Sequence, residues 1–598
     1  MAGEIVGIDL GTTKSVIARW REGAPRIIAD PEGRSITPSV VALDPATGQL
    51  VAGWHAQSVG AANPERAISS IKRFMGRRFT DDVVQKAIDK LRVFYKVDEA
   101  ERNGGIEVSV GTLRLTPQQV SARILQELKD NAEAELGHSP TRAVVTVPAY
   151  FHDSQRQATR NAGRIAGLDV TRVLNEPTAA CLAYGYNRLA DQRRLVAVYD
   201  LGGGTFDISI LEVGRGPFRV RATNGDTHLG GDDLDWMLVE WALGEISSRL
   251  NEQLNSDVHA LAHLRAAAKE AKADLSTQQM TRMKVPGRLS PSSDIQDLDL
   301  ELTRARLDAI AASFVQSTLG PCRSALEDAG VKASDIKEVL LVGGQTRMPA
   351  IRRAVAEFFG REPDTSLHPE QVVALGAAVQ AAIISGDATG LKLADVVPLS
   401  LGVRTDEGLM YSLVPRNTQV PFRKVAPFST TSDNQEAVEI RIYQGERPKA
   451  VENTRLGEFM LRGIKPARAG EPEIEVTFQV DADGILHVSA EDVETGNFKE
   501  LTITNSLRLS EDEIVGMVRD AEAHAAEYEE GRRRLALEGQ ATRLRSRLTT
   551  MLAERRASLT DELADAIRGS LDVEAPADWA AHVKELTELL RRAGGAGT

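Results

Sequence analysis

Apolar residues recur along the first two thirds of the chain in short runs that predict buried strands, separated by longer helical patterns. Four of these runs are Glu4–Leu10, Ala143–Val147, Leu195–Asp200 and Glu338–Val342. Strands that alternate with helices are typical of α/β architecture. One helix start is well marked, because Thr116 is a good cap residue, Pro117 suits the first helical position and Gln119 completes a capping box.

The pattern changes near residue 390, and short alternating runs dominate from about residue 397 to residue 505. In one of these runs, Val438, Ile440 and Ile442 point one way, whereas Glu439, Arg441 and Tyr443 point the other. The alternation returns at Ile474, Val476, Phe478 and Val480, and a turn at Asp481–Gly484 precedes a strand at Ile485–Ala490. These runs predict an all-β unit with one buried face.

A further change comes at Ser510–Glu513, which forms a capping box before a helical and strongly charged segment. The chain therefore divides into an α/β part (1–388), a connecting segment (389–397), an all-β part (398–508) and a helical part (509–598). The longest apolar run, Val372–Ile384, is broken by Gln380 and is too short to cross a membrane. It predicts a buried helix.

Composition narrows the possible partners. Lys plus Arg number 72 and Asp plus Glu 85, which leaves a formal charge of −13. Such a protein is a poor candidate for binding nucleic acid or anionic membranes non-specifically, so a nucleotide would need a locally built pocket. The two cysteines, Cys181 and Cys322, exclude a disulfide scaffold, and no signal peptide is apparent. We expect a cytoplasmic protein.

An internal repeat provides candidate chemistry. Val6–Thr13 resembles Val198–Thr205: each is an apolar strand that ends in Asp and is followed by a glycine-containing turn and Thr. The glycines would let backbone N–H groups approach phosphate oxygens, and Asp9 and Asp200 are suited to hold a hydrated Mg²⁺. Two ordinary hairpins, each with an aspartate that caps its turn, are the alternative, but the matched positions argue against it. No Gly-Lys dipeptide and no GxGxxG fingerprint is present, which excludes a Walker P-loop and argues against a dinucleotide site.

Several longer motifs identify a family. The motifs are Ile8–Thr13, Asn175–Ala180, Asp200–Asp207 and Leu341–Pro349, extended by Val147–Phe151, Asn224–Gly231 and Asp395–Gly402. Together they resemble the 70-kDa heat-shock chaperones in their bacterial DnaK-type form, from residue 4 to about residue 525. The resemblance implies an actin-like (duplicated ribonuclease H-like) ATPase domain, a linker, a β-sandwich that binds peptides and an α-helical lid. It also implies a stress-response protein that assists protein folding.

The same resemblance implies roles for individual residues. The catalytic group is Lys72, Glu176, Thr205 and Asp207, and the coordinators of Mg²⁺ and K⁺ are Asp9 and Asp200. Contacts to ATP or ADP are expected from Gly11, Thr12, Thr13, Gly202, Gly203, Gly204, Gly230, Gly231, Lys272, Ser276, Gly343, Gly344 and Arg347. From the residues alone, Lys72 is better interpreted as a surface lysine of a basic helix, whereas for Glu176 an ordinary turn and a functional role are equally good interpretations.

Coupling and peptide binding are implied in the same way. Pro148 and Arg156 resemble a switch pair, and Arg172 and Asp395 match the region that contacts J-domain cochaperones and the neighbouring domain. A GrpE-type exchange factor is a further implied partner. The expected peptide groove consists of Leu401, Val403, Phe428, Val438, Ile440 and Ile474. Their alternative is an ordinary sandwich core, and the alternatives for Pro148 and Arg156 are a strand end and a surface arginine.

The chain departs from the family pattern at several positions. Near the nucleotide, Lys14 replaces an asparagine, and Asp232 and Lys269 stand where glutamates are usual. In the linker, Lys392 interrupts the usual aliphatic run and cannot bury its ammonium cheaply, so we expect weaker interdomain coupling. Over the groove, Asp406 and Thr431 replace an apolar and a small residue, which favours basic clients. The lid is short.

Two other functions compete with an ATP-dependent peptide-binding chaperone. A small-molecule kinase, such as a sugar kinase, shares the duplicated fold but needs no all-β part after residue 397. A regulatory scaffold that does not hydrolyse ATP would not need Lys72, Glu176, Thr205 and Asp207.

Overall fold

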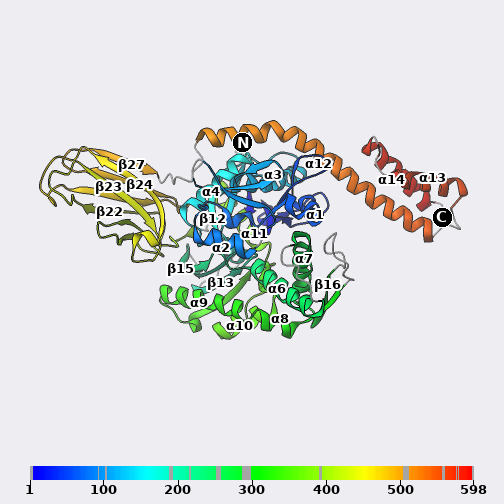
Figure 1. Ribbon diagram of the computed structural model, residues 1–598, viewed down its shortest axis with the longest axis horizontal. Coiled ribbons are helices and arrows are strands. Elements are labelled where there is room, and N and C mark those ends of the chain that lie inside the picture. Colours follow the sequence, from blue (N-terminus) through cyan, green and yellow to red (C-terminus); the bar gives the residue numbers. More distant parts are fainter. Residues whose placement is uncertain are drawn as a thin grey trace. The chain divides into compact units, whose positions relative to one another are not determined.

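The computed structural model describes residues 4–91, 93–101, 104–186, 193–214, 217–250, 257–285, 298–388, 393–502, 511–554, 559–573, 576 and 578–595 (Figure 1). Its contacts separate the chain into two compact units. The first comprises Met1–Leu43 and Val51–Val518, and the second comprises Asp44–Leu50 and Arg519–Thr598.

The first large sheet contains the first copy of the repeat. Its strand order is β12 (Asp169–Asn175), β11 (Arg142–Val147), β1 (Ile5–Asp9), β2 (Lys14–Arg21) and β3 (Ala24–Ile28), with β4 (Thr37–Pro38) paired to β2. Strand β1 runs parallel to β11 and forms an antiparallel hairpin with β2. The turn between β1 and β2 therefore follows Asp9 directly.

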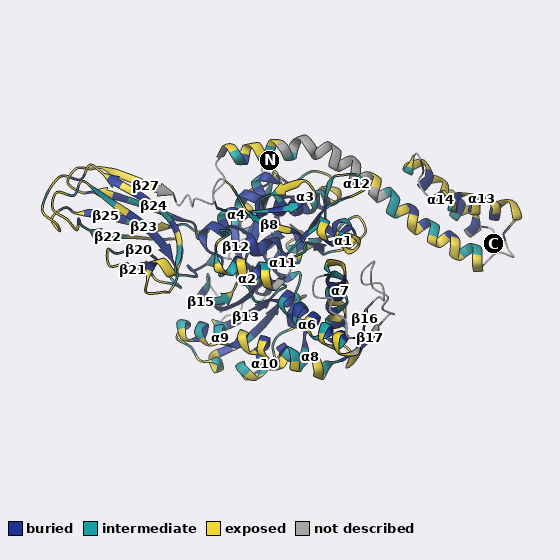
Figure 2. Cartoon of the chain, in the orientation of Figure 1, coloured by how far each residue is buried: buried dark blue, intermediate teal, exposed yellow. Residues whose placement is uncertain are grey.

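The second large sheet repeats this arrangement. Its order is β18 (Ile336–Val342), β13 (Arg194–Leu201), β14 (Phe206–Val213), β15 (Phe218–Asp226) and β19 (Leu393–Ala394). Strand β13 is parallel to β18 and antiparallel to β14, as β1 is to β11 and β2. The predicted mixture of strands and helices is confirmed, and the strands of both sheets are largely buried (Figure 2).

Two helices pack beside these sheets. Helix α11 (Val372–Ser385) contacts both β1 and α5 (Glu176–Gly185), and most of its residues are buried, as predicted for the apolar run. The contact with α5 depends on Gly376, because a Cβ atom at this position would lie 1.7 Å from the carbonyl oxygen of Ala179. Backbone contact this close brings Glu176, at the start of α5, beside the hairpins.

Smaller elements complete the α/β part. Its remaining strands are β5 (Val40–Leu43), β6 (Leu50–Ala52), β7 (Ala67–Ser69), β8 (Lys96–Glu99), β9 (Ile106–Val110), β10 (Leu113–Leu115), β16 (Met280–Val285) and β17 (Leu298–Thr303). Its remaining helices are α1 (Gly53–Ala62), α2 (Asp82–Leu91), α3 (Pro117–Leu136), α4 (Asp153–Ile165), α6 (Gly231–Leu250), α7 (Val258–Asp274), α8 (Arg304–Ile310), α9 (Ala312–Ala329) and α10 (Pro349–Phe359). The capping box predicted at Thr116 and Gln119 is present.

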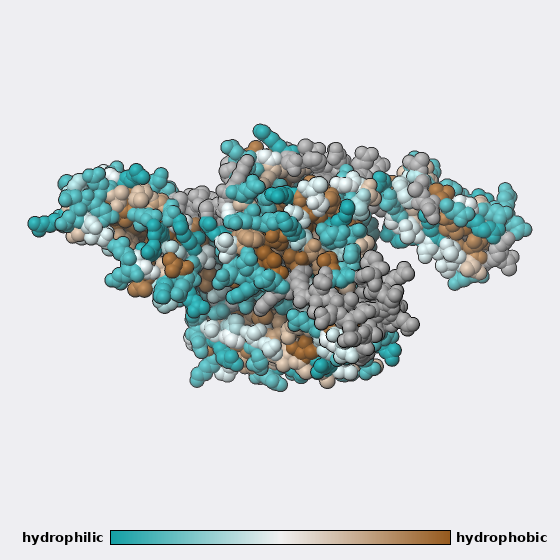
Figure 3. Space-filling view, in the orientation of Figure 1, coloured by the Kyte–Doolittle hydropathy of each residue, from teal (hydrophilic) through white to brown (hydrophobic). Residues whose placement is uncertain are grey.

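The all-β part consists of two four-stranded sheets. One has the order β21 (Met410–Val414), β20 (Leu401–Arg404), β23 (Ala437–Gln444) and β24 (Thr454–Arg462), and the other β22 (Phe422–Phe428), β25 (Ile474–Val480), β26 (Leu486–Asp492) and β27 (Phe498–Thr502). Alternation along β25 is confirmed. On β23 the outward position of Tyr443 is wrong: this residue is buried, because the register of β23 with β24 shifts between Ile442 and Tyr443. Hydrophilic residues predominate on the face drawn in Figure 3.

The second unit contains a small helical core. Helices α12 (Glu511–Glu554), α13 (Asp561–Leu571) and α14 (Trp579–Gly595) bury apolar side chains together, among them Leu548, Ile567 and Leu586. The predicted cap Ser510 lies outside the described residues. Among the helices within the described ranges, none combines the length and the apolar character that a membrane span requires.

Candidate functional site

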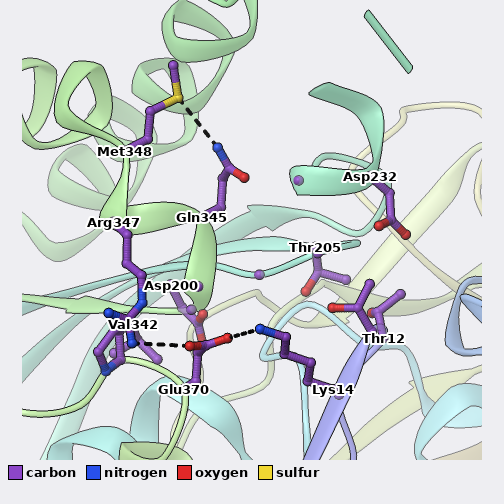
Figure 4. Close-up of a pocket in the computed structure, with 18 of the residues that line it drawn as sticks. Thr12, Lys14, Asp200, Thr205, Asp232, Val342, Gln345, Arg347, Met348 and Glu370 are labelled. Atoms are coloured by element: carbon purple, nitrogen blue, oxygen red, sulfur yellow. Dashed lines mark hydrogen bonds and ion pairs between the residues drawn. The ribbon is translucent and has the colours of Figure 1, made fainter. Parts of the chain in front are cut away.

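A cavity of about 460 Å³ opens where the two hairpins meet (Figure 4). The turn after β1 contributes Thr12 and Thr13, and the turn after β13 contributes Gly202 and Gly203. Segments from both sheets and from α5, α6 and α7 complete the lining. The two copies of the repeat therefore face one another, as expected for a ligand held between them.

Glycines allow the hairpins to approach this closely. A Cβ atom on Gly203 would lie 2.5 Å from Thr13 Oγ1, and one on Gly204 would lie 2.5 Å from Thr12 Cγ2. A Cβ atom on Gly230 would likewise lie 2.5 Å from the backbone of Gly203. A side chain at Gly203 or Gly204 would push the two turns apart, and one at Gly230 would displace the second turn.

The carboxylates of Asp9, Glu176 and Asp200 and the ammonium of Lys72 line this end of the cavity, and the carboxylate of Asp207 is buried near them. Lys72 Nζ donates to Glu176 Oε1 over 2.6 Å, and the two residues are 5% and 8% exposed. Lys72 belongs to a short 3-10 turn, Ile71–Phe74, whose residues are all buried. The alternative interpretation of Lys72 as a surface lysine is therefore wrong, and Glu176 is the first residue of α5.

The pKa values of Asp9, Asp200 and Asp207 are raised. Burial and the neighbouring Glu176 raise the pKa of Asp9 from 3.8 to about 7. Burial and the charges of Glu176, Asp207 and Asp9 raise the pKa of Asp200 well above 3.8. Burial and the charge of Glu176 raise the pKa of Asp207 to about 8, although the Tyr150 N–H donates to its Oδ1 over 3.1 Å. Lys72 alone does not balance this cluster of negative charge.

A divalent cation fits this donor set. Among the residues that the structure describes, no group of three or more acidic, His or Cys side chains is placed to enclose a metal. Mg²⁺ does not require one, because it commonly binds through one or two carboxylates, several waters and the phosphates of its ligand. Asp9 and Asp200, which both line the cavity, offer the oxygen ligands and the negative charge that such an ion needs.

The other end of the cavity is formed by residues of α6, of α7 and the turn after it, and of the turn after β18. Lys272 Nζ lies 2.6 Å from Asp235 Oδ1 and donates to the carbonyl of Gly231 over 2.8 Å. Gly343 has a φ of 82° and approaches the backbone of Leu201, so only glycine fits there without strain. Ser276, Gly344 and Arg347 also line this end.

Most of the predicted site residues therefore come together. Among the predicted catalytic, metal-binding and nucleotide-binding residues, the exceptions are Gly204, Gly230 and Asp207, which are not part of the lining. Sequence reasoning missed several lining residues, among them Gln345, Asp235 and Glu370. Gln345 is 7% exposed and its amide nitrogen donates only to the weak acceptor Met348 Sδ, over 3.5 Å; its position between two predicted glycines and Arg347 was the available signal. No pattern in the sequence marked Glu370 as a lining residue.

Comparison with known proteins agrees with this geometry. The model of the Hsp70 protein family matches residues 5–591, which is nearly the whole chain. The chain belongs to the Hsp70 family. Members of this family are ATPases and chaperones that bind ATP or ADP with Mg²⁺ and act on unfolded polypeptides together with cochaperones.

The Hsp70 residues expected to couple the domains lie where the α/β part meets the β-sandwich. Arg156 is 4% exposed, and its guanidinium donates to Asn175 Oδ1 over 2.5 Å and to the carbonyls of Ala149 and Phe151 over 3.2 Å. It is therefore no surface arginine. Pro148 is buried and accepts a hydrogen bond from the Phe151 N–H over 3.2 Å.

The connecting segment also reaches the second sheet. Strand β19 pairs in parallel with β15, so that Leu393 and Ala394 lie opposite Phe218 and Arg219. Asp395 is 8% exposed and accepts from Thr178 Oγ1 over 3.4 Å, and its own carbonyl accepts from the Val420 N–H over 2.9 Å. Lys392 lies outside the described residues.

The turn at Asp481–Gly484 contacts the α/β part as well. Asp483 forms ion pairs with Arg172 Nε, at 3.1 Å, and with the Arg160 guanidinium. Arg416, which follows β21, is paired with Asp328 of α9 at 2.6 Å. Charged contacts thus connect the β-sandwich to the ATPase part at several points.

The expected groove residues belong to the sandwich core. Leu401, Val403, Ile440 and Ile474 are at most 5% exposed, and Phe428 and Val438 pack on them as partly buried neighbours. Asp406 and Thr431, the expected arch positions, are exposed. These six residues thus form part of a core, and its edge at Phe428 and Val438 is partly exposed to solvent.

Proposed function

We propose that this chain is an ATP-dependent peptide-binding chaperone of the DnaK type, in which ATP hydrolysis changes the affinity for extended apolar segments of unfolded proteins. The proposal rests above all on one observation. The buried Lys72–Glu176 pair meets Asp9 and Asp200 between two Gly-Thr turns in a chain that matches Hsp70. Mg²⁺ bound there would neutralise phosphate charge and orient the triphosphate.

The chain's own residues supply the remaining chemistry. Phosphoryl transfer needs positioning and charge stabilisation more than a strong base. In this proposal the Lys72 ammonium faces the transferred phosphate, Glu176 and Asp207 orient water, and the Thr205 hydroxyl donates near the γ-phosphate. Thr12, Thr13 and the turn glycines hold the phosphates by backbone N–H groups, while Lys272, Ser276 and Arg347 enclose the adenosine. K⁺ is proposed as a second cation beside Asp9 and Asp200.

We infer that the state of the nucleotide reaches the peptide groove along the connecting segment. Support comes from the chain of contacts through Arg156, Asn175 and Asp395 to β19, and from the ion pair of Arg172 with Asp483. An allosteric effect requires two states with different client affinity, and contacts between domains are where such states differ. J-domain and GrpE-type cochaperones are the proposed partners, in the cytoplasm, where the buried free thiols of Cys181 and Cys322 would stay reduced.

One assay separates this proposal from its competitors. ATP turnover is measured with and without an extended apolar peptide, and then with a panel of sugars. Turnover that rises with peptide supports the chaperone. Turnover that requires a sugar would indicate a small-molecule kinase, and binding of ATP without any turnover would indicate a scaffold.

A further inference from the structure

Three charged side chains meet at the rim of the cavity. Lys14, the first residue of β2, lies with its Nζ 2.5 Å from Glu370 Oε1. Arg347, which follows β18, donates from Nη2 to Glu370 Oε2 over 3.1 Å. Figure 4 shows Glu370 between the two cations, with each carboxylate oxygen bound to one of them.

Exposure places this triad at the opening of the cavity and not at its base. The side chains of Lys14 and Arg347 are 45% and 43% exposed, whereas that of Glu370 is 13% exposed. Burial would raise the pKa of Glu370, but the hydrogen bond and charge of Lys14, together with Arg347, lower it below its usual value of 4.5. Glu370 is therefore ionised at neutral pH and holds both cations.

The two cations come from opposite sides of the cavity. Lys14 belongs to the first large sheet, whereas Arg347 lies in a turn that follows β18 of the second. Glu370 precedes α11, which packs on β1, and its carboxylate lies 3.0 Å from where a Cβ of Gly344 would stand. By contrast, Lys272 and Asp235 form a pair within one side, on α7 and α6.

We propose that Lys14, Glu370 and Arg347 form an ionic latch across the rim of the nucleotide cavity, which opens before a nucleoside diphosphate leaves. The inference rests on the proposed nucleotide site. A latch between the two sheets slows dissociation, because the sheets must separate there before the nucleotide can pass. Lys14 acts through Glu370 in this scheme, not through a direct contact with phosphate.

The test measures release of a fluorescent ADP analogue chased with unlabelled ADP, for wild type, Lys14→Met, Glu370→Gln and the double variant. Half-exposed ion pairs contribute up to about 1 kcal/mol, so each single variant is expected to release the analogue about two- to fivefold faster. The double variant is expected to match Glu370→Gln. Raising the salt from about 0.05 M to about 0.5 M should accelerate release by wild type but not by Glu370→Gln, which has lost both ion pairs.

Lys96→Met is the matched control, because this lysine is exposed, is paired with Asp98 at 2.9 Å and does not line the cavity. It should release the analogue at the wild-type rate. If Lys14→Met still accelerates release in the Glu370→Gln background, Lys14 contacts the nucleotide directly and the latch is wrong. Unchanged release by all variants, with ADP still bound, contradicts the latch alone; failure of wild type to bind ADP contradicts the proposed function.

Discussion

Replacing Lys72 with methionine would separate its charge from its packing. Methionine keeps most of the length and the apolar body of the side chain but removes the ammonium, whose Nζ lies 5.6 Å from the centre of the Phe151 ring. The ammonium that donates to Glu176 over 2.6 Å is lost. The charge of Lys72 also lowers the pKa values of Asp9, Asp200 and Asp207, so the variant leaves the carboxylates with no ammonium among them.

The magnitude follows from this geometry. Losing one preorganised donor that stabilises transition-state charge lowers kcat by about 10²–10³-fold. Removing one partner of a buried ion pair costs up to about 3–5 kcal/mol in folding free energy. ADP affinity should change much less, since the turn glycines and threonines that hold the phosphates remain.

The assay is single-turnover hydrolysis of ATP with enzyme in excess, combined with titration calorimetry for ADP and a urea melt for stability. Lys86→Met is the control, because Lys86 is an exposed residue of α2 and does not line the cavity. A folded Lys72→Met variant that hydrolyses ATP within about threefold of wild type would refute the role given to this lysine, because that difference corresponds to less than about 1 kcal/mol in the barrier.

Four further predictions concern stability, coupling and clients. Gly376→Ala should lose about 1–3 kcal/mol or more of folding free energy in a urea melt, because its Cβ meets Ala179, whereas Gly244→Ala in α6, with nothing within 4 Å, should not. Burial lowers the pKa values of His152 and His228, the latter to about 3, so the contribution of each histidine to stability is fully present above pH ~6.5 and falls below it by about 1.4 kcal/mol per pH unit. His152→Asn should remove its share of that slope, and a slope equal to that of wild type would contradict the assignment. Lys392→Leu should strengthen stimulation of ATP turnover by peptide; equal stimulation would show that Lys392 does not weaken docking. Asp406→Met should reduce any preference for Lys or Arg flanks on a peptide array, and a wild-type array without that preference would remove the hypothesis.

Local patterns predicted much of the fold. The capping box at Thr116, the buried helix α11 and the alternation on β25 depend on neighbours in sequence, and all three are confirmed. The failure at Tyr443 has a physical cause, because a register shift in pairing with β24 turns a side chain inward without leaving a trace in the period of β23. Alternation cannot predict which partner strand will introduce such a shift.

Contacts at long range could be predicted only in part. The matched hairpins indicated that two turns would face each other, and the glycine contacts between them agree with that expectation. Lys72 and Glu176, however, are 104 positions apart and Lys14 and Glu370 are 356 apart. The first pair was suggested by the family resemblance. The second is a departure of this chain, which no local pattern and no family motif marks.

The charge of the cavity determines what a nucleotide would need in order to bind there. Among the described residues, five basic and six acidic side chains line the cavity, so its formal charge is close to zero and slightly negative. Of the basic side chains in the lining, Lys72 is already paired with Glu176 and Lys272 with Asp235. A polyphosphate therefore gains little from fixed positive charge. In the proposed function, binding depends on a cation that neutralises Asp9 and Asp200, so metal removal at neutral pH is the perturbation expected to weaken ADP binding most.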